Sequence, residues 1–208
     1  MKIKAVIFDL DGTITEPYLD FDKIRQEIGL SSDSEPILES MAKMSPAQRE
    51  KTEEILYKHE QLAVEHSTLN KGAAQLFDWL KKNNIPVGVL TRNTKHNASA
   101  VAAKHNLEFH AIFDRNDGPA KPDPFGVQKL CDFFKVNPQE TLVVGDYLYD
   151  LQCAKAAGAT AILVRAGKNA EKFGSEADYI IDSLAEIIDI ITKNTKPRIQ
   201  NYEKHKKN

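Results

Sequence analysis

Acidic, hydroxyl and basic side chains follow several apolar runs of this sequence. Asp9 and Asp11 come directly after the run that ends at residue 8, and Thr91 follows a run in the middle of the chain. Asp146 follows a third run, and Lys121 lies in a turn before a predicted helix. Carboxylate oxygens are the ligands that Mg²⁺ prefers, and cations neutralise phosphoryl oxygens. The sequence therefore indicates metal-assisted phosphoryl transfer.

The two carboxylates of the first group, Asp9 and Asp11, suit different roles in such a reaction. A carboxylate can act as the nucleophile, since aspartyl phosphates are established covalent intermediates. A second carboxylate two residues further on can protonate a leaving alcohol and then deprotonate the attacking water. We therefore interpret Asp9 as the candidate nucleophile and Asp11 as the candidate general acid and base.

The apolar runs before these residues are predicted to be strands of a parallel sheet. The run over residues 5–8, within a predicted strand at 4–10, is nearly continuous, which is typical of a strand buried on both faces. From residue 71 onward, apolar runs alternate with helical patterns, which indicates an α/β fold with a Rossmann-like, three-layer core. Such sheets bind ligands at the carboxyl ends of their strands. We expect strands at residues 4–10, 87–90, 111–113, 141–144, 161–164 and 179–181, and helices at 72–82, 95–105, 124–134, 148–157 and 184–192.

A helical segment interrupts this pattern after the first strand. Residues 20–69 show no convincing strand and are rich in Glu, Lys, Gln, Leu and Met, which favour helices. Ser45 and Pro46 provide a helix N-cap and a first-turn proline, so the longest helix is expected to begin there. The predicted domains are a core of residues 1–16 and 70–192, an all-helical cap of residues 17–69 and a solvated basic tail of residues 193–208. Helices are expected within the cap at 20–28, 35–44 and 46–66.

The motif Asp9-Leu10-Asp11-Gly12-Thr13 resembles the DxDGT signature of the haloacid dehalogenase-like hydrolase superfamily. Three further motifs of that family follow in order along the chain, and the match spans roughly residues 3–164. They are Leu90-Thr91-Arg92-Asn93, Lys121-Pro122-Asp123-Pro124 and Gly145-Asp146-Tyr147-Leu148-Tyr149-Asp150.

The resemblance implies a role for each matching residue. Asp9 would be the nucleophile and a Mg²⁺ ligand, and Asp11 would be the acid and base and lend its backbone carbonyl to the metal. Asp146 and Asp150 would anchor the metal or its waters. The residues implied to hold the substrate phosphate are Thr91 and Lys121; Arg92, beside the second motif, is a further candidate for that contact, with a solvated salt bridge as the alternative.

The second aspartate of the first motif bears on the type of reaction. Haloacid dehalogenases lack it because they do not protonate an alkoxide leaving group, so Asp11 favours a phosphatase. The position of the insertion resembles the phosphoglycolate phosphatase-like branch, although the cap is shorter than is typical there and Tyr147 replaces a small hydroxyl residue. The expected substrate is a small phosphorylated metabolite such as phosphoglycolate or a sugar phosphate.

Several alternatives stay open at this point. On the same fold, a phosphomutase, a pyrophosphatase or a nucleotidase would use the same residues, and the substrate is not identified. A phosphorelay receiver also forms an aspartyl phosphate, but its acceptor lies on the third strand, whereas Asp9 follows the first. A catalytically silent module that binds a phosphorylated ligand is the last alternative, and the retention of both Asp9 and Asp11 argues against it.

Composition limits the partners and the setting of the chain. The formal net charge of -2 gives no general attraction to nucleic acid or to an anionic membrane, so neither is expected as a partner. Cys131 and Cys153 lack CxxC spacing, and the first residues carry charge where a signal peptide needs an apolar run. We therefore expect a cytoplasmic protein, and its oligomeric state is not predicted.

Overall fold

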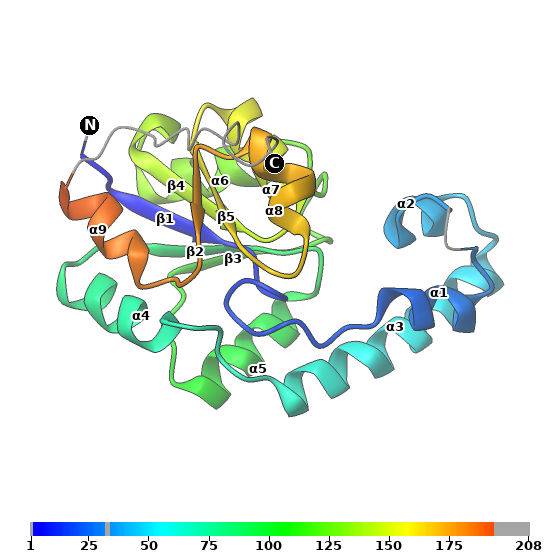
Figure 1. Ribbon diagram of the computed structural model, residues 1–208. Coiled ribbons are helices and arrows are strands. Elements are labelled where there is room, and N and C mark those ends of the chain that lie inside the picture. Colours follow the sequence, from blue (N-terminus) through cyan, green and yellow to red (C-terminus); the bar gives the residue numbers. More distant parts are fainter. Residues whose placement is uncertain (1, 32–33, 194–208) are drawn as a thin grey trace, which may run out of the picture. The chain divides into compact units, whose positions relative to one another are not determined.

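The computed structural model describes residues 2–31 and 34–193, and it divides the chain into two compact units. The sheet unit consists of the described parts of Met1–Glu16 and Thr68–Asn208, and the helical unit is Pro17–Ser67. Figure 1 shows the parallel sheet of the first unit and the helices of the second.

The sheet unit is built on six parallel strands in the order β3-β2-β1-β4-β5-β6. The chain runs outward from β1 to one edge and then returns to build the other edge from β4, so the strand order reverses between β1 and β4. Ligand sites of open α/β sheets lie at such a switch point, beyond the carboxyl ends of the strands. The strands are β1 (Ala5–Phe8), β2 (Val87–Leu90), β3 (Ala111–Phe113), β4 (Thr141–Gly145), β5 (Thr160–Val164) and β6 (Tyr179–Ile181).

Strands β1 and β4 are paired in the middle of the sheet and are completely buried. Their register sets Phe8 opposite Val144, so both strands end at the same level. Both strand sequences are almost purely apolar because helices cover both faces of the sheet at this central position. The residues that follow the two strands are therefore brought together.

Helices cover the two faces of the sheet (Figure 1). One core cluster joins β1, β4 and β5 to side chains from α6, α7 and α8, and α4, α5 and α9 lie on the opposite face. Helix α5 begins at a side-chain cap, since Thr94 Oγ1 accepts a hydrogen bond from the Asn97 amide. The helices are α4 (Ala73–Lys82), α5 (Lys95–His105), α6 (Phe125–Phe134), α7 (Leu148–Ala157), α8 (Asn169–Phe173) and α9 (Glu186–Lys193), with short 3₁₀ turns at Pro138–Glu140 and Gly174–Glu176.

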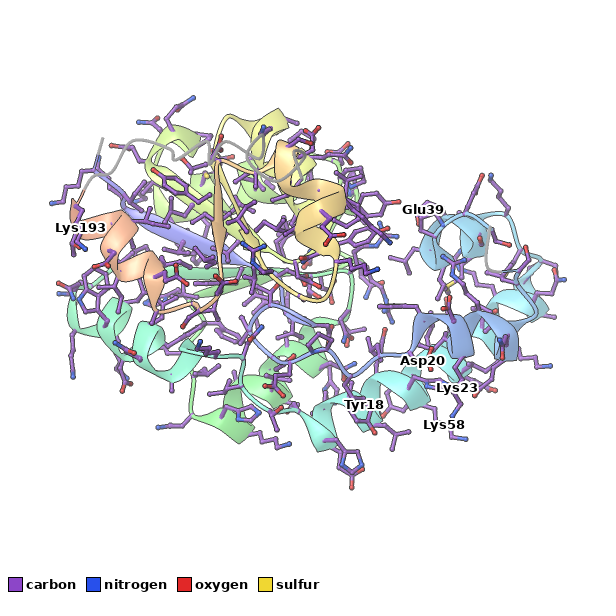
Figure 2. The ribbon with its side chains drawn as sticks, in the orientation of Figure 1. Tyr18, Asp20, Lys23, Glu39, Lys58 and Lys193 are labelled. Carbon is purple, nitrogen blue, oxygen red and sulfur yellow. The ribbon has the colours of Figure 1, made fainter. Side chains whose placement is uncertain are left out.

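The helical unit consists of α1 (Phe21–Ile28), α2 (Ile37–Ala42) and α3 (Pro46–His66). Its own small core is formed by Ile24, Ile37, Met41 and Leu56, which come from all three helices. On its surface, His59 Nε2 of α3 lies 3.0 Å from Glu27 Oε2 of α1. Figure 2 labels Lys23 of α1 and Lys58 of α3. The hydrogen bond from His59 lowers the pKa of Glu27, and the charges of these two lysines add to that effect.

The α/β class predicted from the sequence is confirmed, and six predicted elements have the predicted bounds: β2, β3, β6, α3, α5 and α7. Helix α8 was not predicted, because its five residues are too few to show a helical period. Lys193 ends α9, and the rest of the predicted tail lies outside the described residues. Within the described part of the chain, no helix combines the length and apolar character needed to cross a membrane.

Candidate active site

Asp9 and Asp146 follow the two central strands and meet at the switch point of the sheet. The turn after β1 is tight, because Gly12 adopts a φ of 87°, which L side chains rarely adopt. A Cβ atom at Gly12 would also come within 2.6 Å of Asp146 Oδ2. Glycine at this position therefore permits the two loops to approach each other. Thr13 strengthens the contact, since its hydroxyl donates to Asp146 Oδ1 at 3.2 Å.

Lys121 lies at the centre of the candidate site. Its ammonium donates to Asp9 Oδ1 at 2.5 Å and to Asp150 Oδ1 at 2.6 Å, and only 4% of its side chain is exposed. Burial acts to lower the pKa of Lys121, but the charges of Asp150 and Asp9 outweigh it and hold the pKa above its ordinary value. Lys121 is thus a fixed cation in the turn that the sequence predicts.

Burial also changes the acidity of the carboxyl groups beside Lys121. Desolvation raises the pKa of Asp9 well above its usual value, and the charges of Asp150 and Asp146 add to that effect while Lys121 opposes it. Burial, together with the charge of Asp150, raises the pKa of Asp146 to about 7. Three carboxylates thus lie around one ammonium, which leaves negative charge for a further cation to neutralise.

Asp150 is held by the helix on which it lies. It occupies the third position of α7, where its Oδ2 accepts from the Tyr147 backbone amide at 3.1 Å and so caps the helix. Its other oxygen faces Lys121. A Cβ atom at Gly145 would lie 2.1 Å from the Asp150 side chain, so the last residue of β4 must be glycine for Asp150 to fit.

The donor set fits a hard divalent cation. One carboxylate oxygen from each of Asp9, Asp146 and Asp150 can be chosen so that all three lie within 4.8 Å of one another. All three ligand atoms are oxygens, which Mg²⁺ and Ca²⁺ prefer and which soft metals do not. These three residues could therefore hold a metal ion, as the sequence motifs imply.

Asp11 lies beside this group but has different partners. Its Oδ2 accepts a hydrogen bond from Asn93 Nδ2 at 3.0 Å. Burial raises the pKa of Asp11, while the hydrogen bond from Asn93 and the charge of Lys121 oppose the shift. A carboxyl group with a raised pKa is better able to hold a proton for a leaving group, and once ionised it can accept one.

Thr91 and Arg92 follow β2, the strand next to β1. Thr91 is buried, and its hydroxyl accepts from the Asn93 backbone amide at 3.0 Å. Arg92 Nη1 donates to the backbone carbonyl of Lys121 at 2.6 Å, and its guanidinium lies over the Tyr149 ring, 5.3 Å from the centroid. Arg92 therefore joins the second motif to the turn that carries Lys121 and to the helix after β4.

Several residues that shape this site have no role that the sequence indicates. Asn93 belongs to the second motif, but nothing in the sequence indicates that its amide faces Asp11. Asn169, at the start of the unpredicted helix α8, donates from Nδ2 to the Asp146 backbone carbonyl at 2.8 Å. These contacts depend on how distant loops fold together, so sequence spacing alone could not reveal them.

Known proteins of one family resemble this chain over most of its length. A family model described as haloacid dehalogenase-like hydrolase matches residues 30–158, which is more than half of the chain. A haloacid dehalogenase-like hydrolase domain-containing protein of Arabidopsis thaliana is 28% identical, over 93% of this chain and 85% of the relative. The phosphoglycolate phosphatase of Chromobacterium violaceum is 27% identical, over 91% of this chain and 96% of the relative.

A solved structure supports the fold. The β-phosphoglucomutase of Clostridium difficile aligns with a TM-score of 0.74 and 22% identity, over 92% of this chain and 98% of that protein. At that identity the likeness concerns the fold alone, and it includes both the parallel sheet and the chain that interrupts it.

Proposed function

Since this chain belongs to the haloacid dehalogenase-like hydrolases, we propose that it is a Mg²⁺-dependent phosphatase that acts through an aspartyl phosphate at Asp9. The observation that carries the proposal is the cluster around Lys121. There the candidate nucleophile Asp9 lies against a buried ammonium, near the carboxylates Asp146 and Asp150. Asp11 lies beside this cluster, hydrogen-bonded to Asn93.

In the first step, a carboxylate oxygen of Asp9 forms a bond to phosphorus while the bond from phosphorus to the leaving oxygen breaks. Asp11 gives its proton to that leaving oxygen, so an alcohol departs. Lys121 stays charged throughout, because its pKa is raised, and it neutralises charge on the phosphoryl oxygens. Thr91 would contribute its hydroxyl to the same oxygens.

In the second step, water attacks the phosphorus of the aspartyl phosphate. Asp11, now ionised, takes a proton from that water, and the bond between phosphorus and the Asp9 oxygen breaks. Inorganic phosphate leaves and both aspartates return to their starting forms. One residue can serve as acid and then as base because its two tasks follow each other.

Asp9, Asp146 and Asp150 would hold the Mg²⁺, together with the backbone carbonyl of Asp11. The ion, when bound, supplies counter-charge to the phosphoryl oxygens and to the carboxylates that would otherwise repel the substrate. Its proposed site agrees with the raised pKa of Asp146, since a cation would offset the charge of Asp150.

The proposed substrate is a small phosphorylated metabolite, such as phosphoglycolate or a sugar phosphate. The helical unit supports this, because its sequence begins directly after the nucleophile loop and a lid there would exclude large substrates. We propose no nucleic acid or membrane as partner, in keeping with the net charge of -2. A cytoplasmic location remains part of the proposal.

The test is the release of inorganic phosphate from p-nitrophenyl phosphate and from a panel of phosphorylated metabolites. We expect turnover with Mg²⁺, loss of turnover in excess EDTA and recovery when Mg²⁺ is added back. Full activity in excess EDTA would overturn the assignment. A mutase would instead convert one phosphorylated sugar into its isomer without net phosphate release, so product analysis separates these two alternatives.

A further inference from the structure

The side chain of Asn93 contacts the candidate acid Asp11 in an orientation that two other groups determine. Asn93 Oδ1 accepts from the Thr94 backbone amide at 2.7 Å and from Asn97 Nδ2 at 2.8 Å. A backbone N–H can only donate, so the atom of Asn93 that faces it must be the oxygen. The Nδ2 group therefore points the other way, toward Asp11 Oδ2 at 3.0 Å.

Both asparagines of this chain of contacts are buried. Asn93 is 5% exposed and Asn97 is 1% exposed, so water competes little for their hydrogen bonds. Asn97 is also fixed by its helix, because it lies in the first turn of α5, where its backbone amide donates to the N-cap Thr94. The orientation of the Asn93 amide is thus set by the start of a helix.

We propose that Asn93, held by Asn97, is a positioning residue that fixes the Asp11 carboxyl group for proton transfer to the leaving group. The inference rests on the proposed function. Asn93 Nδ2 occupies Asp11 Oδ2, which leaves Oδ1 as the oxygen that exchanges the proton. Proton transfer requires hydrogen-bond reach between that oxygen and the leaving oxygen, so a carboxyl group free to rotate would be less effective.

The readout must respond to proton delivery and not to general damage. Benzyl phosphate has an alcohol leaving group that needs a proton, whereas p-nitrophenyl phosphate of similar size releases a stable phenolate. The value of kcat/KM covers the steps up to departure of the leaving group. The ratio of kcat/KM for benzyl phosphate to that for p-nitrophenyl phosphate, here called the leaving-group ratio, therefore reports how well the acid is positioned.

We expect Asn93→Ala to lower the leaving-group ratio by about 10-fold or more, as part of the roughly 100- to 10,000-fold that a general acid contributes. Asn97→Ala, which leaves the Asn93 side chain itself in place, should lower it less. In the double variant, loss of Asn97 should have no further effect, because its action passes through Asn93. An unchanged ratio in both single variants would overturn the inference.

Two controls separate positioning from stability. Val101 is a buried residue of the same helix, 2% exposed, and Val101→Ala should destabilise α5 without changing the leaving-group ratio. Asn116 is an exposed asparagine after β3, and Asn116→Ala should leave the ratio unchanged as well. If Val101→Ala lowered the ratio as much as Asn93→Ala does, the effect would be structural and the inference would be wrong.

The same measurements distinguish this inference from the proposed function. If the unaltered enzyme with Mg²⁺ releases no phosphate from either compound, the proposed function fails. If it is active and Asp11→Asn lowers the leaving-group ratio while Asn93→Ala does not, the function stands and the positioning role of Asn93 is refuted.

Discussion

The ion pairs at the candidate site of the sheet unit are buried, whereas two ion pairs of the helical unit are exposed. In the sheet unit, Lys121, Asp9 and Asp150 form ion pairs whose side chains are 4 to 12% exposed. In the helical unit, the ion pairs Lys43–Glu35 and Arg49–Glu53 have side chains that are 52 to 69% exposed. Breaking a buried pair costs about 3–5 kcal/mol, whereas an exposed pair contributes about 0–1 kcal/mol.

The difference indicates a division of labour. Buried charges that fix one another provide a preorganised site, which is what phosphoryl transfer needs. The helical unit exposes several large side chains, with Tyr18, Phe21 and Tyr57 all about half exposed. Tyr18 also stacks on His66, 5.5 Å between ring centroids. We infer that the sheet unit performs the chemistry and that the helical unit selects the substrate.

The largest expected effect comes from the nucleophile. Asp9→Asn should reduce turnover to background, because an amide is a poor nucleophile and a poorer ligand for Mg²⁺. The exposed Asp22 of α1 gives the matched control, and Asp22→Asn should keep the aryl phosphatase activity. Phosphate release is measured for both variants. Retained turnover in Asp9→Asn would place the nucleophile elsewhere and remove the basis for the division of labour.

The next largest expected loss of activity comes from substitution of Asp11. Asp11→Asn should lower kcat/KM for an alkyl phosphate by about 100- to 10,000-fold, because the alkoxide then leaves without a proton. An activated aryl phosphate should be affected less in this step. Steady-state kinetics on both compounds provide the measurement, and equal losses on the two would mean that Asp11 is not the general acid.

Much of the fold follows from the sequence because the period of apolar residues reflects burial directly. The run Ala5–Phe8 could be recognised because it is buried on both faces, and Val87–Leu90 for the same reason. Ser45 and Pro46 predict the start of helix α3 as an N-cap and a first-turn proline, and the structure adds a capping box between Ser45 and Gln48. Local signals of this kind need no knowledge of the rest of the molecule.

The site could be predicted only as a set of residue types at strand ends. The sequence placed Asp9 and Asp146 at strand ends, and the strand order then made them neighbours. It could not show that Lys121 would join Asp9 to Asp150, because Lys121 lies in a loop, where apolar residues do not recur at a regular spacing. The orientation of Asn93 depends on contacts between loops and a helix start, which no local pattern encodes.

A smaller effect on rate is expected from removal of the helical unit. The two segments of the sheet unit that flank it lie side by side. The Glu16 amide donates to the Thr68 carbonyl at 2.9 Å, and Thr15 pairs with Leu69. A short Gly-Ser turn can therefore replace Pro17–Ser67 without a change of the paired ends. We expect much of the activity on p-nitrophenyl phosphate to remain, while discrimination among metabolites falls.

The variant must first be shown to be folded, for which circular dichroism and gel filtration suffice, since removal of the unit can expose apolar surface. The ratio of kcat/KM between the best and the poorest metabolite of the panel is then compared with that of the full chain. A folded variant that kept the parent's preference would show that the sheet unit selects the substrate, which contradicts the division of labour.

The smallest expected effect is on stability, and it should be confined to the sheet unit. Burial and the charge of Asp150 raise the pKa of Asp146 from 3.8 to about 7, so the metal-free folded state binds a proton that the unfolded state releases. This contribution is complete below about pH 4 and is lost as the pH rises toward 7. Mg²⁺ favours the ionised carboxylate, so it should stabilise the protein more at pH 8 than at pH 5.

The single tryptophan, Trp79, lies on α4, so its fluorescence follows unfolding of the sheet unit. Metal-free protein should lose Tm between pH 5 and pH 8, by about 2–4 °C for each kcal/mol lost. Asp146→Asn should show a smaller pH dependence and a smaller response to Mg²⁺, because the group that titrates is gone. An equal pH dependence in the variant would mean that Asp146 is not the source. An equal response to Mg²⁺ would place the ion elsewhere and would contradict the proposal that the buried carboxylates of the sheet unit bind it.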